Sequence, residues 1–300
     1  MITHKPSSIS ELQELLPQLQ GVSEVSLESV AEFVEHVSDD MTATVQAGMT
    51  LAEFQSNLAR ANQWLPVDPP QTESVTIGEL LAGNLNGPRR FGFGSIRDWL
   101  IGLAVVLPDG RLIRNGGKVV KNVAGFDLCR LFVGAKNELG IIVEATFKLL
   151  PLPEAETHLC KRCESLAQAD ELLGKVWDSD LQPRVLDLYR IGGDSLMLVT
   201  GFAGTCVDVE VQSDTAKDLG FAAEASLDYD ARFRQTTPNF TSVAPGKLIS
   251  TLHDLGDKSF VSRAGNGVIY HASAKPLEIP SSNLQKRVKE IFDPKGVLAG

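Results

Sequence analysis

The chain has 300 residues, of which 38 are Asp or Glu and 28 are Lys or Arg, so its formal net charge is −10. This charge argues against nucleic acid as the main partner, because phosphate binding requires clustered Lys and Arg. The longest apolar run, Trp99–Leu107, is too short to cross a bilayer, and the first twenty residues lack the basic start and apolar middle of a signal peptide. We therefore expect a cytoplasmic protein with no transmembrane segment, and its four cysteines fit a reducing compartment.

The first third of the chain carries alternating helix and strand signals. Leucines at helical spacing predict a helix over Ser10–Gln20, capped at its first residue. Residues 42–47 alternate as a strand does, and the capping box Thr50–Glu53 starts a helix that we expect to end near Asn62. Residues 65–70 contain three prolines, which remove backbone donors and fix φ, so this segment is predicted to be a loop.

Beyond this loop, turn residues separate the predicted elements. A second capping box, Thr76–Glu79, precedes a short helix, and the glycines of residues 84–94 argue against regular structure there. Residues 101–114 predict a β-hairpin whose turn is the dipeptide Asp-Gly. Residues 141–149 predict a strand that is followed by prolines.

We expect the chain to divide into two domains near Pro151, because cores of this size tend to split and a proline-flanked exit fits a boundary. The first would contain residues 1–152, and the second, a smaller α+β domain, residues 153–300. Within the second, residues 185–201 predict another hairpin. A C-terminal helix has one apolar face, through which we expect it to dock, consisting of Leu284, Val288, Ile291 and Phe292.

Residues 85–140 differ from the rest of the chain in charge. They hold nine Lys or Arg against four Asp or Glu, a net charge of +5, so the remaining residues carry −15. Twelve of the 26 glycines lie between residues 78 and 140, and glycine lets backbone amides approach a ligand closely. This segment predicts an anion or nucleotide site, with a loop-rich surface as the alternative. The Rossmann fingerprint is absent, since Arg97 replaces its third glycine, and no stretch has Walker A spacing.

Six segments resemble, in their order and spacing, the vanillyl-alcohol-oxidase type of FAD-binding domain, also called the PCMH type. They are Thr44–Gly48, Thr76–Gly78, Asn86–Arg90, Gly94–Asp98, Gly116–Leu128 and Leu139–Ile142. Within them, Gly87–Arg90 and Lys121–Asp127 are similar specifically to the FAD-binding subunit of glycolate oxidase, as is Phe292–Leu298. The resemblance implies an α+β fold in which a PCMH-type FAD-binding domain is followed by a smaller α+β cap domain.

The same resemblance implies which residues contact the cofactor. The amides of Thr76, Ile77 and Gly78 would face the flavin and its phosphates. The other implied contacts are Asn84, Gly87 and Ser95 along the ribityl and pyrophosphate path, Arg97, Asp98, Lys121 and Asp127 as polar anchors, and Gly140 and Ile142 at the adenosine end. The alternative for Arg97 and Asp98 is an ordinary ion pair between neighbours.

Two departures from the family bear on cofactor binding. Residues 1–47 hold a single glycine, so the family's glycine-rich pyrophosphate loop is missing between Gln20 and Val22, and the first subdomain is shortened. Glu79 stands where the family has a second glycine, which adds a carboxylate close to the expected phosphates. Both changes weaken the expected affinity for FAD.

Histidines and cysteines carry weaker signals. No histidine lies between His36 and His158, so a histidyl-flavin link has no candidate and FAD should be bound noncovalently. His271 follows a strand-like segment and is a candidate general base, with a structural histidine as the alternative. His158–Cys163 has a partial zinc-ligand spacing, but no second pair completes four ligands, so we expect no metal site.

One function and one alternative follow from the resemblance. The first is an FAD-dependent subunit that helps to oxidise a small 2-hydroxy acid such as glycolate, beside a larger FAD-linked oxidase subunit and an iron–sulfur subunit. No cysteine cluster in this chain could hold an iron–sulfur centre, so electrons would pass to such a partner. The alternative is a degenerate, cofactor-free FAD fold that serves as a scaffold subunit of such a complex.

Overall fold

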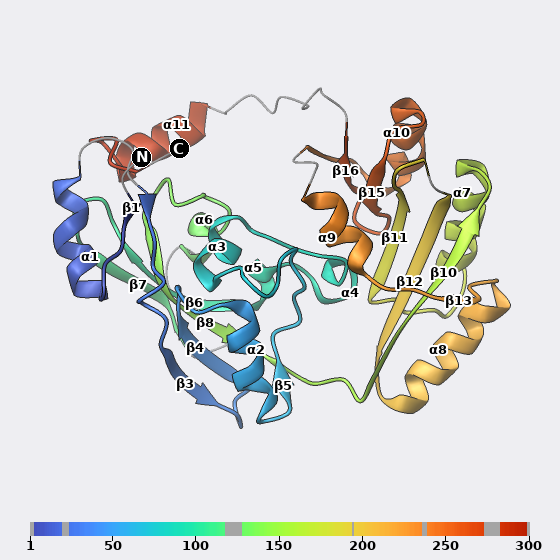
Figure 1. The fold of residues 1–300 in the computed structure, drawn as a ribbon, viewed down its shortest axis with the longest axis horizontal. Helices are drawn as coiled ribbons and strands as arrows, with labels where there is room; N and C mark the ends of the chain where they lie inside the picture. Colours follow the sequence, from blue (N-terminus) through green and yellow to red (C-terminus); the bar gives the residue numbers. More distant parts are fainter. Residues whose placement is uncertain are drawn as a thin grey trace. The chain divides into compact units, whose positions relative to one another are not determined.

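A computed structural model describes residues 3–19, 24–117, 128–193, 195–235, 239–272 and 283–298. The chain forms two compact units (Figure 1). The first contains residues 1–86, 95–152 and 280–300, and the second contains residues 87–94 and 153–279. Both units combine helices with a main sheet whose strands are antiparallel, so the predicted α+β class is confirmed.

This division differs in two places from a single cut after residue 152. Residues 87–94 join the second unit, where the amide of Gly92 donates to the carbonyl oxygen of Arg184 at 3.0 Å. The C-terminal residues join the first unit, where the ring of Phe292 packs edge-on against that of Phe132 with centroids 5.8 Å apart. Both differences arise from tertiary contacts between segments far apart in the sequence, which local patterns do not encode.

The first unit is built on a five-stranded antiparallel sheet with the order β3-β4-β8-β6-β7. Its strands are β3 (Phe33–Val37), β4 (Thr42–Gln46), β6 (Leu100–Val106), β7 (Leu112–Gly116) and β8 (Ile141–Lys148). Strands β6 and β7 form the predicted hairpin, and Gly110 in its turn has a φ of +83°, which glycine adopts without strain. Two short pairs lie outside this sheet: β1 (Thr3–His4) with β2 (Glu24–Val25), and β5 (Gln63–Trp64) with β9 (Leu150–Pro151).

Short helices cover this sheet. They are α1 (Ile9–Leu15), the 3-10 turn η1 (Leu16–Gln18), α2 (Leu51–Ala59), α3 (Ile77–Ala82), α5 (Ile96–Trp99), α6 (Cys129–Phe132) and α11 (Asn283–Phe292). The predicted capping boxes begin α2 and α3. Helix α1 is capped by Ser8 and not by the predicted Ser10, since the Ser8 side chain accepts from the amide of Glu11. It buries Leu12 against residues of β6 and β8.

The apolar face predicted for the C-terminal helix is buried only in part. On α11, Leu284 is 67% exposed and Ile291 is 75% exposed, whereas Val288 is half-buried and Phe292 packs against Phe132. The residues after the helix dock as well, since residues 297 and 298 are buried and donate their amides to Asp293 at 2.8 and 2.9 Å. Helical periodicity alone cannot distinguish the exposed part of such a face from the buried part.

The second unit is a seven-stranded antiparallel sheet with the order β13-β10-β12-β11-β15-β16-β14. Its strands are β10 (Ala155–Cys163), β11 (Val185–Arg190), β12 (Leu196–Gly204), β13 (Ala223–Glu224), β14 (Phe240–Ser242), β15 (Phe260–Arg263) and β16 (Val268–His271). Its helices are α4 (Arg90–Phe93), α7 (Leu166–Trp177), α8 (Cys206–Asp218), α9 (Asp228–Arg234), η2 (Pro245–Lys247) and α10 (Leu248–Leu255). The predicted hairpin corresponds to β11 and β12.

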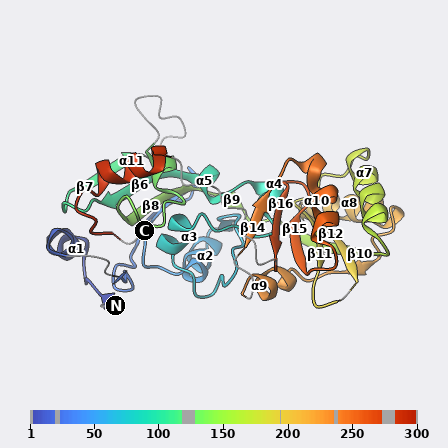
Figure 2. The same ribbon diagram turned by 90° about the horizontal axis from the view of Figure 1, so that it is seen from above.

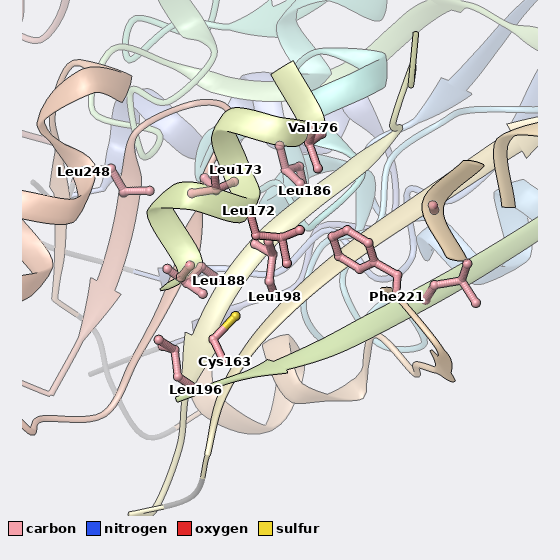
Figure 3. Close-up of a cluster of buried hydrophobic side chains, with 14 of the residues drawn as sticks. Cys163, Leu172, Leu173, Val176, Leu186, Leu188, Leu196, Leu198, Phe221 and Leu248 are labelled. Atoms are coloured by element: carbon pink, nitrogen blue, oxygen red, sulfur yellow. The ribbon is translucent and has the colours of Figure 1, made fainter. Parts of the chain in front are cut away.

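The main core of the second unit lies between its sheet and α7, α8 and α10. Leu172 and Leu173 of α7 pack there with Leu186, Leu198 and other buried apolar side chains (Figure 3). Helix α9 lies on the other face, as both views of the ribbon show (Figure 1, Figure 2), and forms a second cluster. The sheet is thus covered by helices on both faces, and side chains that alternate along β11 enter two separate cores.

Candidate functional site

The N-terminus of α3 is the first place where the sequence predicts cofactor contacts. Thr76 Oγ1 accepts from the Glu79 amide at 3.2 Å, and the Glu79 carboxylate accepts from the Thr76 amide at 2.9 Å. The amides of Ile77 and Gly78 donate to carbonyl oxygens within residues 47–49 at 2.9 and 2.8 Å. All four amides therefore have acceptors inside the protein. A phosphate could accept from the Thr76 amide only if the Glu79 side chain turned away, and from the Glu79 amide only if the Thr76 hydroxyl released it.

Asn84 lies where α3 meets the loop after α6. Its φ is +46°, and its main-chain oxygen accepts from the side chain of Asn86 at 2.5 Å. The amide of Gly134 donates to the carbonyl oxygen of Leu81 at 2.9 Å, and a Cβ added to Gly134 would lie 3.3 Å from the Cβ of Asn84. The structure thus brings Asn84 beside the 134–140 segment. Gly87, the next predicted contact, belongs to the second unit.

Ser95 and Asp98 close a capping box around α5. The Asp98 carboxylate accepts from the amide and from the hydroxyl of Ser95, both at 2.8 Å. Burial works to raise the pKa of Asp98, but these hydrogen bonds and the charges of Arg130 and Lys148 outweigh it, so the pKa lies below its usual value. Arg97 donates to the carbonyl oxygen at the end of α6 at 3.0 Å, and its buried Nε has no hydrogen-bond partner among the described residues.

Gly140 and Ile142 lie at the start of β8. A Cβ on Gly140 would lie 2.6 Å from Cγ1 of Val105, and Ile142, which pairs with Val105, is 1% exposed. Close packing within the first unit therefore explains both residue types, and any ligand contact would be made by their backbone. The remaining predicted contacts, Lys121 and Asp127, lie outside the described residues.

His271, the candidate general base, is 3% exposed at the end of β16. Its Nε2 lies 3.1 Å from Thr241 Oγ1, and the strand register pairs it with Phe260 of the main core. Burial, together with the charge of Lys258, lowers the pKa of His271, so the ring is neutral near pH 7. A general base needs this protonation state, but the enclosed position favours the structural alternative.

Arg89 belongs to an ionic group that sequence reasoning missed. Its guanidinium donates to the Glu156 carboxylate at 2.9 and 2.6 Å, and His158 Nε2 lies 3.3 Å from the same carboxylate. Burial works to raise the pKa of Glu156, but the hydrogen bonds with His158 and Arg89 and the charge of Arg89 lower it to about 2. The contact attaches residues 87–94 to β10. No local pattern could have indicated it, because Arg89 and Glu156 are 67 positions apart.

A second ionic group that the sequence did not indicate lies between α9 and the sheet. Arg263 of β15 binds the carboxylates of Asp187 and Asp230, and Tyr229 donates its hydroxyl to Asp187 at 2.7 Å. All three charged side chains are at most 2% exposed. Burial raises the pKa of Asp187 to about 6, against the opposing charge of Arg263.

Two further findings concern the described part of the chain. It contains no group of three or more His, Cys, Asp or Glu residues that could hold a metal ion. None of its helices is long and apolar enough to cross a bilayer.

Part of this chain is similar to known proteins. Residues 9–116 match the family model described as FAD binding domain (FAD_binding_4). Glycolate oxidase subunit GlcE of Escherichia coli (strain K12) is 38% identical over 151 residues, which are 50% of this chain and 42% of that protein. Glycolate oxidase subunit GlcD of Bacillus subtilis (strain 168) is 34% identical over 172 residues, which are 57% of this chain and 36% of that protein. The chain thus covers less than half the length of these relatives.

A solved structure shows the same fold over nearly the whole chain. Alkyldihydroxyacetonephosphate synthase superposes with a TM-score of 0.75 and 17% identity, over 99% of this chain and 75% of that chain. At this identity the likeness concerns the fold alone. Together with the match of residues 9–116 to the FAD binding domain model it confirms the predicted α+β fold with an FAD-binding domain in the first part of the chain.

Proposed function

Because residues 9–116 carry an FAD binding domain, we propose that this chain binds FAD noncovalently and takes part in oxidising a small 2-hydroxy acid such as glycolate. The domain match is the observation that carries the proposal. The similarity to two glycolate oxidase subunits and to a D-lactate dehydrogenase of Archaeoglobus fulgidus, 35% identical over 136 residues, supports the substrate class. FAD, when bound, accepts the hydride that leaves the hydroxyl-bearing carbon.

The described residues fit this cofactor in part. Arg97 is a cation whose guanidinium is fixed by a hydrogen bond to the carbonyl oxygen of Val133, and its charge suits a phosphate. Ser95 and Asp98 hold the helix that carries Arg97, so they act as positioning residues. The Thr76 amide at the start of α3 becomes a donor to a phosphate only when Glu79 leaves the capping box. Contacts by Gly87, Lys121, Asp127, Gly140 and Ile142 remain part of the proposal through the family resemblance.

The proposed partners are a larger FAD-linked oxidase subunit and an iron–sulfur subunit. The similarity to GlcD and GlcE, which are named as subunits of glycolate oxidase, supports membership of such a complex. Onward transfer to an iron–sulfur partner is part of the proposal, since the four cysteines of the chain, which are Cys129, Cys160, Cys163 and Cys206, form no group among the described residues that could hold a metal ion.

A cofactor-free scaffold subunit is the second candidate function. It is favoured by the engagement of all four amides at the start of α3 within the protein, one of them by the Glu79 carboxylate and one by the Thr76 hydroxyl. A chain that no longer binds a phosphate at this helix would retain such a capping box for its effect on stability.

Spectroscopy of the purified chain distinguishes the two functions. The protein is purified with excess FAD, freed of unbound flavin on a desalting column, and then precipitated with acid. We expect flavin absorbance to elute with the protein and to pass into the acid supernatant, followed in a second sample by bleaching on anaerobic addition of glycolate. Flavin that stays in the acid pellet contradicts noncovalent binding, and a colourless protein supports the scaffold function.

A further inference from the structure

Helix α11 presents an apolar side to solvent on the surface of the first unit (Figure 2). Leu284 is 67% exposed, and Ile291, at 75%, is the most exposed large apolar side chain among the described residues. Leu284, Arg287 and Ile291 follow one another at intervals of three and four positions, so they lie along one side of the helix. The adjoining side carries Val288, which is half-buried, and Phe292, which packs in the first unit. The helix is thus attached by one side and leaves an apolar side uncovered.

Cations surround this apolar side. Residues 283–298 have a net charge of +2 in a chain whose net charge is −10. Their charged residues are the cations Lys286, Arg287, Lys289 and Lys295 and the acids Glu290 and Asp293. Arg130 and Lys136 lie beside the helix, since they line the same pocket as two of its lysines. In the part of the chain that the structure describes, none of the four cations of residues 283–298 has an ion pair. This surface is a local reversal of sign.

A hollow of about 400 Å³ lies beside Ile291, between the end of α11 and the turn of the β6–β7 hairpin. Its apolar lining consists of Leu107, Pro108, Ile291, Phe292 and Pro294. Arg111 and Lys295 line it as well, together with Asp109 and Asp293. Asp109 is paired with Arg111 at 2.7 Å, and Asp293 is buried and accepts from two backbone amides. Apolar side chains and two cations therefore share one depression next to the exposed side of the helix.

Helix α8 has exposed apolar side chains without this charge. Val207 and Val211 are 69% and 57% exposed and lie four positions apart, on one side of the helix. The charged residues of α8 are Asp208, Glu210, Asp214, Asp218 and Lys217, so its net charge is −3. A surface of anionic groups would be repelled by α8 and attracted to α11. The charge around the apolar side therefore distinguishes α11 from α8.

We propose that α11 and the hollow beside it bind the surface of an anionic phospholipid bilayer. A helix that lies in the bilayer interface combines an apolar side with Lys and Arg around it, and anionic lipids attract such cations. A protein partner fits less well, because lysine is depleted from protein–protein interfaces whereas aromatic residues are enriched there. Among the described residues of α11, the exposed ones include Lys286 and Arg287 and no aromatic residue. This binding is peripheral, and it requires neither FAD nor substrate.

Vesicle flotation of the 300-residue chain tests the proposal. One set of vesicles contains phosphatidylglycerol and phosphatidylcholine in equal parts, and the other contains phosphatidylcholine alone. We expect the chain to float with the anionic vesicles only and to be released by high salt, which screens the charges. Lys286→Gln/Arg287→Gln should weaken binding by about tenfold or more, since each cation near such a surface contributes about fivefold. Leu284→Ser/Ile291→Ser should weaken binding by about tenfold or more through the lost apolar burial.

The matched control is Val207→Ser/Val211→Ser, which removes two equally exposed apolar side chains from α8. Its binding should stay within about twofold of the wild type. Thermal melts confirm that all variants are folded. Failure to bind the anionic vesicles overturns the proposal and favours an acidic protein as the partner of α11. Equal binding to both kinds of vesicle, unchanged binding in the α11 variants, or an equal loss in the α8 control also overturns it. A chain that binds vesicles but no flavin supports this proposal while it contradicts the proposed redox function.

Discussion

Replacing Arg263 with methionine would leave two buried carboxylates without their common partner. Arg263 is 1% exposed, and the carboxylates of Asp187 and Asp230 that it binds are 0% and 2% exposed. Removal of one partner from a buried ion pair costs about 3–5 kcal/mol when the remaining charge has neither water nor a counterion, and this applies to Asp187, whereas Asp230 keeps a longer ion pair with Arg234 at 3.7 Å. We therefore expect Arg263→Met to lower the free energy of unfolding of the second unit by about 3–5 kcal/mol at pH 7.5.

The pH dependence of this loss is a specific signature. Burial raises the pKa of Asp187 to about 6 although the charge of Arg263 opposes it, so removal of that charge raises the pKa further. An acid whose pKa is higher in the folded than in the unfolded state reduces stability as the pH rises from the unfolded value, about 3.9, toward the folded one. At pH 5 the Asp187 carboxyl is mostly protonated in the folded wild type and in the folded Arg263→Met variant. The destabilisation should thus be smaller at pH 5 than at pH 7.5 by about 1 kcal/mol or more.

Urea unfolding followed by circular dichroism at both pH values measures this effect. Lys175→Met is the control, since Lys175 forms an exposed ion pair with Glu171 and its loss should change stability by less than about 0.5 kcal/mol. Adding Asp187→Asn and Asp230→Asn to Arg263→Met should restore much of the stability, because no unpaired charge remains. A loss below about 1 kcal/mol that is the same at both pH values would refute the reasoning.

Two further predictions concern the capping box of α3 and the Arg89–Glu156 pair. Glu79→Gly should tighten FAD binding by about tenfold, since it frees the Thr76 amide, whereas Glu53→Gly in the matching box of α2 should leave the affinity unchanged. Flavin fluorescence titration measures both affinities, and equal responses contradict a phosphate at α3. The pKa of Glu156 is lowered from its unfolded value of 4.5 to about 2 in the folded state, so its ionised carboxylate stabilises the fold at pH values above 4.5. This stabilisation is lost as the pH falls toward 2. Arg89→Gln should thus cost about 1–2 kcal/mol at pH 7 and much less at pH 3, and thermal melts showing equal losses at both pH values would contradict this account.

The parts of the fold that the sequence predicts correctly are those encoded by neighbouring residues. The capping boxes at Thr50 and Thr76 depend on a hydrogen bond between positions three apart, and both helices begin as expected. The hairpin at Gly110 depends on a turn that only a few residue types can form. These signals require no knowledge of the rest of the chain.

The division into units could not be predicted in full, because it depends on contacts across long sequence distances. Residues 87–94 are surrounded in sequence by the first unit, yet Arg89 and Gly92 bind residues 67 and 92 positions away in the second. On α11 the helical spacing of Leu284 and Ile291 suggested a buried face, but the segment after the helix fills that role. Periodicity predicts that a face is apolar, and only tertiary packing decides what covers it.

The candidate site combines both kinds of information. The positive excess of residues 85–140 predicts an anion site, and Arg97, Arg130 and Lys136 of that segment line one pocket of the first unit. Two more cations of that lining, Lys286 and Lys289, lie on α11, which the sequence assigns to the second domain and the structure assigns to the first. Charge composition therefore predicts a cationic surface, whereas the tertiary position of the C-terminal helix, which no local pattern encodes, decides which cations gather there.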